Sequence, residues 1–184
     1  MGKSAFRSDW ARTESDVPTS FGSTHVLAAG DRSKPPLVAL HGSSISSTMW
    51  VPNLPVLTAT HLVTTVGAID EVGKSVAARP TIRSADLVGW LDEVLCALGI
   101  QRSALVGASR GTWIATHYAA AYPERVERLA LLCPVGIAGG MRPRFLMLGL
   151  TSMACGRARG GCGRCSIRWS RRRPAVSCAG RLGD

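Results

Sequence analysis

The sequence predicts an α/β fold, in which helices cover both faces of a mostly parallel sheet to give three layers, α/β/α. Three observations predict it. Segments with the apolar pattern of strands alternate with segments of helical periodicity between residues 17 and 133. The segment PPLVALHGSS, at 35–44, is an unbroken apolar run ending in a glycine turn, as expected for a strand buried on both faces. The strand-like segment at 103–106 leads through a glycine-rich turn into an alanine-rich helix.

The strands follow from local patterns. Two short strands are predicted at 17–22 and 24–29, on either side of a turn at Gly22. Further strands are predicted within 35–44 and at 61–66, 103–106 and 128–133. Because helices separate most of these strands, the sheet should be parallel over most of its width.

Three helices are predicted. Residues 84–98 place apolar side chains on one helical face, and Gly99 is positioned to end that helix. Residues 111–121 form an alanine-rich helix that ends before Pro123. A short helix at 46–57 contains two prolines, which should interrupt it.

The positive charge of the chain is concentrated at its end. The formal net charge is +10. Residues 155–184 contain eight Arg and one Asp, which gives +7, and residues 1–154 carry 14 basic and 11 acidic side chains, which gives +3. We therefore expect one folded domain over 1–154 and a separate Arg-, Gly- and Cys-rich tail over 155–184, disordered or out of frame.

Three interpretations of this tail are open. Cys155, Cys162, Cys165 and Cys178 could bind zinc as four thiolates, although only one Cys-x-x-Cys pair is present. The Arg-rich run could bind nucleic acid through its charge, although it contains no recognisable module. The composition fits best an unrelated reading frame of a GC-rich gene. We therefore expect no metal site and no specific nucleic-acid partner.

Nothing in the sequence indicates a membrane protein. No segment reaches the roughly 20 apolar residues that a membrane span needs. The N-terminus, MGKSAFRSDW, lacks the apolar core of a secretory signal. We therefore expect a cytoplasmic protein without a membrane partner, and its oligomeric state is left open.

The segment LVGASRG contains the pattern G-x-S-x-G, with Gly107, Ser109 and Gly111 at its fixed positions. This pattern is typical of a strained strand-to-helix turn that presents a nucleophilic serine. The two glycines are needed where the strand and helix backbones approach too closely for side chains. The backbone N–H of Arg110, at the start of the helix, can donate to an oxyanion.

A second donor should come from the turn after an earlier strand. In LVALHGSS the buried strand is followed by His41 and Gly42 and then by Ser43, whose backbone N–H can point at the same oxygen. His41 is interpreted as a residue that hydrogen-bonds locally and shapes the loop, not as a base.

These motifs, in this order, resemble the α/β-hydrolase family and its bacterial esterase-type branch. The resemblance extends from about residue 17 to about residue 140 and rests on GSTHVLAAG, PPLVALHGSSISSTMWVPNLPVL, GKSVAARP, LVGASRG and YPERVERLALLCPVG. It implies that Ser109 is the nucleophile, that Ser43 and Arg110 are the oxyanion donors, and that the domain is truncated before the last two strands. The chain departs from the family at GAID, 67–70, where relatives often have Asp-x-x-Gly.

The resemblance implies cofactor-free attack on ester-like acyl substrates through a covalent acyl-enzyme. The base and the acid of the family cannot be matched in this chain. His25 and His61 lie in strand segments before Ser109, and the helix axis carries His117 away from it. We therefore expect impaired hydrolysis. Two alternatives are open: perhydrolysis or another acyl transfer by the same serine, and a non-catalytic scaffold with a zinc- or nucleic-acid-binding tail.

A phosphate-binding loop is rejected. GAIDEVGKS approaches the pattern G-x-x-x-x-G-K-[ST], but five residues instead of four separate Gly67 from Gly73. Asp70 and Glu71 would also face the phosphates with like charge.

Overall fold

Seven strands in the described part of the chain form one mixed sheet. The computed structural model describes residues 12–81 and 83–134, all of which belong to a compact unit that spans Met1–Met141. The predicted domain boundary at 154 and the tail over 155–184 lie outside the described residues. The strands are β1 (Arg12–Thr19), β2 (Gly22–Ala29), β3 (Pro36–Leu40), β4 (Leu62–Val66), β5 (Val76–Ala77), β6 (Ser103–Ala108) and β7 (Val126–Leu132).

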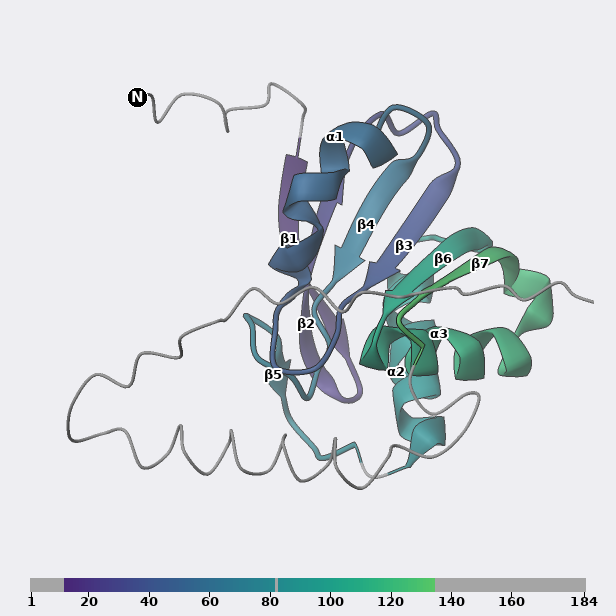
Figure 1. Ribbon diagram of the computed structural model, residues 1–184. Coiled ribbons are helices and arrows are strands. Elements are labelled where there is room, and N and C mark those ends of the chain that lie inside the picture. The colour runs from purple at the N-terminus through teal and green to yellow at the C-terminus, as the bar shows by residue number, and fades with distance from the viewer. Residues whose placement is uncertain (1–11, 82, 135–184) are drawn as a thin grey trace, which may run out of the picture. The chain divides into compact units, whose positions relative to one another are not determined.

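The sheet has a parallel half and an antiparallel half. Its order is β1-β2-β4-β3-β6-β7, and β5 pairs with β2 outside this path (Figure 1). Strands β4, β3, β6 and β7 run parallel to one another, whereas β2 is antiparallel to β1, β4 and β5. The predicted α/β fold is therefore confirmed, with a larger antiparallel share than the helix-separated pattern suggests.

The register places the ends of three parallel strands together. Leu40, the last residue of β3, pairs with Val66 at the end of β4 and with Gly107 near the end of β6. Because parallel strands end at the same edge of a sheet, the loops that begin at His41, Gly67 and Ser109 start side by side. This edge is where open α/β sheets place their ligands.

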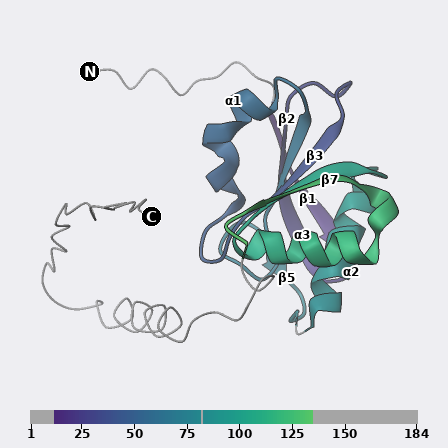
Figure 2. The same cartoon turned by 45° about the vertical axis from the view of Figure 1, so that its right-hand side comes forward.

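The helices cover the two faces of the sheet. Helices α2 (Ser84–Ala97) and α3 (Arg110–Ala121) pack on one face, and 3₁₀ helix η1 (Ser47–Asn53) with the single turn α1 (Leu54–Leu57) packs on the other (Figures 1 and 2). A second 3₁₀ turn, η2 (Pro123–Arg125), leads into β7. The prolines of 46–57 break the predicted single helix into η1 and α1. Gly99, with a φ of 70°, follows the end of α2 as predicted.

Each face of the sheet has its own apolar core. The core under α2 and α3 contains Trp90, Leu91 and Tyr118, none of which is exposed to solvent, packed on β2, β3, β4 and β6. The core under η1 and α1 contains Trp50 and Leu54. Residues 37–40 of β3 alternate between the two cores, which explains why this strand is apolar at every position.

The first hairpin differs from the prediction. Its turn lies at Ser20 and Phe21, not at Gly22, which already pairs with Thr19. Gly22 has a φ of 131°, and a side chain there would also collide with the backbone of β5 at Val76, so both its backbone conformation and a close approach require glycine. Phe21 is buried despite its place in the turn.

Strand β7 is the last strand of the described sheet, and no described strand pairs with its outer edge. Its side chains are more exposed than those of β6, and Leu129 and Leu132 are 38% and 48% exposed. No described helix is long and apolar enough to cross a membrane.

Candidate active site

Ser109 lies alone between β6, which ends at Ala108, and α3, which begins at Arg110. Its φ of 50° and ψ of −113° are unfavourable for a residue with a side chain. Hydrogen bonds hold this conformation: the Ser109 N–H donates to the Leu132 carbonyl at 2.9 Å, and the N–H and hydroxyl of Thr112 donate to the Ser109 carbonyl at 2.9 and 2.5 Å. The structure therefore has the strained strand-to-helix turn that the sequence predicts.

The two flanking glycines lie at points of backbone contact. A Cβ atom at Gly107 would collide with the backbone of Gly111, and a Cβ atom at Gly111 would collide with the carbonyl group of Leu40. The first contact allows α3 to start directly against β6. The second brings the start of α3 against the end of β3. Both glycines are therefore needed for the local geometry of Ser109.

Gly42 brings the loop after β3 against Ser109. A Cβ atom at Gly42 would lie 3.3 Å from the Cβ of Ser109, so the loop backbone passes next to the serine. Ser43 follows and is exposed. Its N–H has no hydrogen-bond partner among the described residues, and the first N–H groups of a helix, such as that of Arg110, have none within the helix.

The side chain of His41 fixes the loop after β3 through two hydrogen bonds. It is 2% exposed, and its two ring nitrogens are both engaged. Nδ1 lies 2.8 Å from the Gly42 carbonyl, to which it must donate, and Nε2 accepts from the Ala68 N–H at 2.8 Å. Burial lowers the pKa of His41, despite an opposing contribution from the bond to Gly42. His41 is thus a neutral imidazole that ties two loops together and has no free nitrogen for a base.

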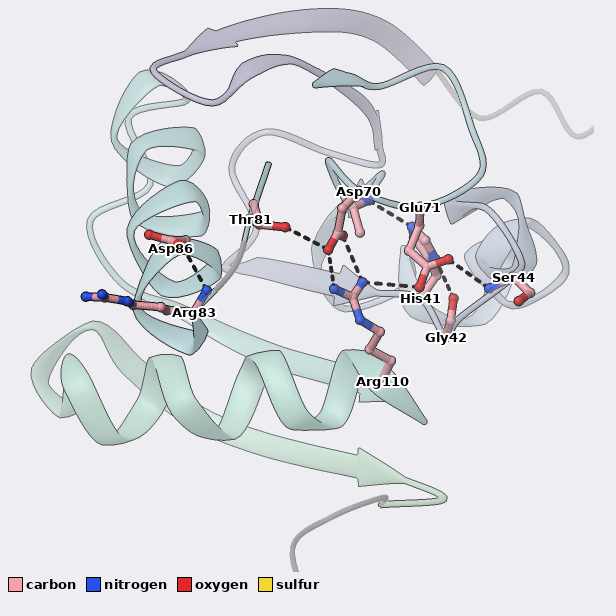
Figure 3. Close-up of polar contacts among 10 residues, drawn as sticks. His41, Gly42, Ser44, Asp70, Glu71, Thr81, Arg83, Asp86 and Arg110 are labelled. Atoms are coloured by element: carbon pink, nitrogen blue, oxygen red, sulfur yellow. Dashed lines mark hydrogen bonds and ion pairs between the residues drawn. The ribbon is translucent and has the colours of Figure 1, made fainter. Parts of the chain in front are cut away.

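Asp70 and Glu71, for which the sequence predicts no role in the site, hold the side chain of Arg110. Its guanidinium makes a bidentate pair with Asp70, at 2.5 and 2.9 Å, and a third contact with Glu71 at 3.3 Å (Figure 3). Thr81 donates to Asp70 at 2.9 Å. Burial raises the pKa of Asp70, but the bonds from Arg110 and Thr81 outweigh it and hold this pKa below its ordinary value. Asp70 and Glu71, whose charge excludes a phosphate-binding loop, therefore contact Arg110, the residue after Ser109.

Glu71 also reaches the loop after β3. Its second carboxylate oxygen accepts from the Ser44 N–H at 2.9 Å (Figure 3). Ser44 has a φ of 62°, a left-handed conformation that residues other than glycine seldom adopt. The one signal in the sequence for this contact is an acidic pair after one parallel strand and an Arg after another, since both lie at the same edge of the sheet.

None of the four histidines of the chain is bonded to Ser109, and all four are described. His25 Nδ1 lies 2.8 Å from Asp16, His61 Nδ1 lies 2.8 Å from the Thr60 hydroxyl, and His117 Nδ1 donates to the Trp113 carbonyl at 2.8 Å. The site thus consists of a serine, two candidate donors and a rigid frame, with no imidazole hydrogen-bonded to the serine.

No described group of three or more His, Cys, Asp or Glu side chains could hold a metal ion. Cys155, Cys162, Cys165 and Cys178, the residues of the zinc interpretation, lie outside the described part. A pocket of about 390 Å³ lies beside Arg110, between Asp70, Thr81 and the first turns of α2 and α3. Ser109 does not line it.

Comparisons with known proteins place the chain in a family. A family model described as the alpha/beta hydrolase fold matches residues 35–151. The uncharacterized carboxylesterase nap of Bacillus subtilis is 37% identical over 118 residues, which are 64% of this chain and 39% of that protein. Carboxylesterase YbfK of Bacillus subtilis is 34% identical over 118 residues, 64% of this chain and 40% of the relative.

Solved structures agree. The crystal structure of naproxen esterase (carboxylesterase NP) from Bacillus subtilis matches with a TM-score of 0.74 and 32% identity, over 77% of this chain and 50% of that one. The chain thus spans between 39% and 50% of the length of these relatives. The matched family model covers more than half of the chain and includes both the Ser109 turn and the loop after β3. The chain belongs to the α/β-hydrolase fold family and is similar to its carboxylesterases.

Proposed function

We propose that this chain is part of a serine hydrolase that acts on ester-like acyl substrates, with Ser109 as the nucleophile. The observation that carries the proposal is the backbone of Ser109, which is strained and supported by hydrogen bonds from both sides. The similarity to two carboxylesterases supports the substrate class.

The reaction would proceed in two steps. The hydroxyl oxygen of Ser109 bonds to the carbonyl carbon of the ester, and the carbonyl oxygen becomes an oxyanion that accepts from the Ser43 and Arg110 N–H groups. Collapse of this intermediate breaks the bond to the leaving alcohol, which takes the serine proton. Water then hydrolyses the acyl-serine and releases the acid.

Removal of the proton from the Ser109 hydroxyl should be the slow step in this chain. A serine hydroxyl is almost wholly protonated at neutral pH, so it needs a base within hydrogen-bond reach. All four histidines have a ring nitrogen hydrogen-bonded to another residue, and none is hydrogen-bonded to Ser109. We therefore propose a reactive serine with an oxyanion site and slow turnover in the 184-residue chain.

A fluorophosphonate probe tests this function, with the modified serine located by peptide mass spectrometry. Ser109 should be modified before any other serine, although slowly, and Ser109→Ala should remove that adduct. Ser15, which is exposed on β1, is the internal control because no strained turn presents it. Modification spread evenly over exposed serines would refute the nucleophile.

A further inference from the structure

We propose that Glu71 is a positioning residue that sets the distance between the two oxyanion donors. The inference rests on the proposed function, because it assigns Glu71 a task in the same site. Glu71 does not touch the reacting atoms. It acts through the segments that carry the N–H groups of Ser43 and Arg110.

The carboxylate of Glu71 joins these two segments directly. One oxygen accepts from Arg110 Nη1 at 3.3 Å, and the other accepts from the Ser44 N–H at 2.9 Å. Arg110 is the residue after the nucleophile, and Ser44 is the residue after the second candidate donor. The Glu71 side chain is only 15% exposed and its contact with Arg110 is partly buried, whereas the contact with the Ser44 N–H lies at the surface.

Glu71 is itself held in place. Its N–H donates to the Ala68 carbonyl at 3.2 Å, and the Ala68 N–H donates to the buried His41. Asp70 accepts one N–H from each of the two Nη atoms of Arg110, which orients the second N–H of Nη1 toward Glu71. The loop after β4 therefore acts as a rigid brace between the loop after β3 and the start of α3.

Ser44 has a strained backbone conformation, which the hydrogen bond to Glu71 helps to maintain. A left-handed residue with a side chain tends to relax unless hydrogen bonds hold it. Relaxation at Ser44 would turn the peptide that follows Ser43 and shift the neighbouring donor. A displacement of about 1 Å in a catalytic group can cost about 10²-fold in rate, so loss of the Glu71 contact should slow the reaction of Ser109.

The test compares three variants of the full chain, each kept well below its melting temperature. Glu71→Ala removes both contacts. Glu71→Gln keeps an oxygen that can accept from the Ser44 N–H but loses the charge that faces Arg110. Glu124→Ala is the matched control, because Glu124 is exposed and its side chain makes no hydrogen bond or ion pair with the described residues. Two quantities are measured: the amide exchange rate of Ser44 by NMR, and the rate of fluorophosphonate modification of Ser109.

Glu71→Ala should raise the Ser44 exchange rate and slow Ser109 modification, each by about tenfold or more, as expected for a displaced oxyanion donor. Glu71→Gln should lie between Glu71→Ala and the unaltered chain, and Glu124→Ala should match the unaltered chain. Unchanged exchange at Ser44 in Glu71→Ala would overturn the proposal, as would faster exchange with an unchanged modification rate. If Ser109 of the unaltered chain is not modified, the proposed function fails, while the exchange rate still decides whether Glu71 holds the loop.

Discussion

Gly111 lies directly against the carbonyl group of Leu40, closer than any side chain at position 111 would allow. This contact joins the first turn of α3 to the end of β3. It therefore sets how near the turn of Ser109 lies to the loop that begins at His41. The geometry of the candidate site therefore rests on a backbone contact as well as on its hydrogen bonds.

Gly111→Ala should destabilise the fold by about 1–3 kcal/mol, the usual cost of forcing an extra methyl group into a packed interior. Gly89→Ala is the matched control. Gly89 lies within α2, and a Cβ atom there would meet nothing within 4 Å, so alanine should stabilise the helix by up to about 1 kcal/mol. Urea unfolding measures both. Equal effects at the two glycines would contradict the close contact.

The buried His41 should make stability depend on pH. The folded pKa of His41 is lowered from its ordinary value of 6.5, with burial as the main cause. Below about pH 6.5 the unfolded chain binds a proton that the folded chain resists, so the free energy of unfolding should fall until the pH reaches the folded pKa. Above pH 6.5 this contribution is constant.

Urea unfolding between pH 8 and pH 5 measures this slope. His41→Gln removes the titrating group and should flatten the slope in this window, although it also removes hydrogen bonds. His61→Gln is the control, at a half-buried histidine whose ring is hydrogen-bonded to its neighbour Thr60, and should retain the slope. An identical slope in the chain and in His41→Gln would show that His41 does not titrate differently on folding.

Much of the fold could be predicted because its signals are local. The apolar run that became β3, the periodicity of α2 and the glycine spacing around Ser109 each report on contacts that the segment itself must make. The turn of the first hairpin was misplaced because Gly22 is required by its φ of 131° and its contact with β5, and a two-residue strand such as β5 has no periodicity to detect. A local pattern does not reveal which distant backbone a glycine approaches.

The frame of the site could be predicted only in part. The resemblance pointed to Ser43, Ser109 and Arg110, but it gave no role to the side chain of Arg110. The contacts of Arg110 with Asp70 and Glu71 join residues about 40 positions apart. They exist because β4 and β6 end at the same edge of the sheet, on either side of β3. Such pairs follow from strand order, which the sequence alone does not specify.

Modification of Ser109 should depend on the backbone N–H of Ser43 and not on its hydroxyl group. Ser43→Pro removes the proposed donor and should slow fluorophosphonate modification of Ser109 by about 10²-fold, as loss of one oxyanion donor does elsewhere. Ser43→Ala keeps the N–H and should stay within about twofold of the unaltered chain. Circular dichroism shows whether each variant is folded. Equal rates in two folded variants would exclude the backbone donor.

The exposed face of β7 should promote self-association of the 184-residue chain. No described strand covers its outer edge, and Leu129 is 38% exposed. Leu129→Lys should lower the association measured by analytical ultracentrifugation. Val56→Lys, which changes a 76% exposed residue of α1 away from this edge, should not. If both substitutions reduce association equally, general solubility and not the edge is responsible.

Incubation with p-nitrophenyl acetate tests the central claim most directly, with released p-nitrophenol and the position of any acetyl group measured together. Loss of the base from a triad costs about 10⁶ in turnover and leaves roughly 10³–10⁴ over water. We therefore predict turnover barely above background, little change in turnover in Ser109→Ala, and a slowly formed acetyl group on Ser109. A fast burst of p-nitrophenol that disappears in Ser109→Ala would contradict the absence of a base and point first to His117. Acetyl groups on other residues alone would contradict Ser109 as the nucleophile.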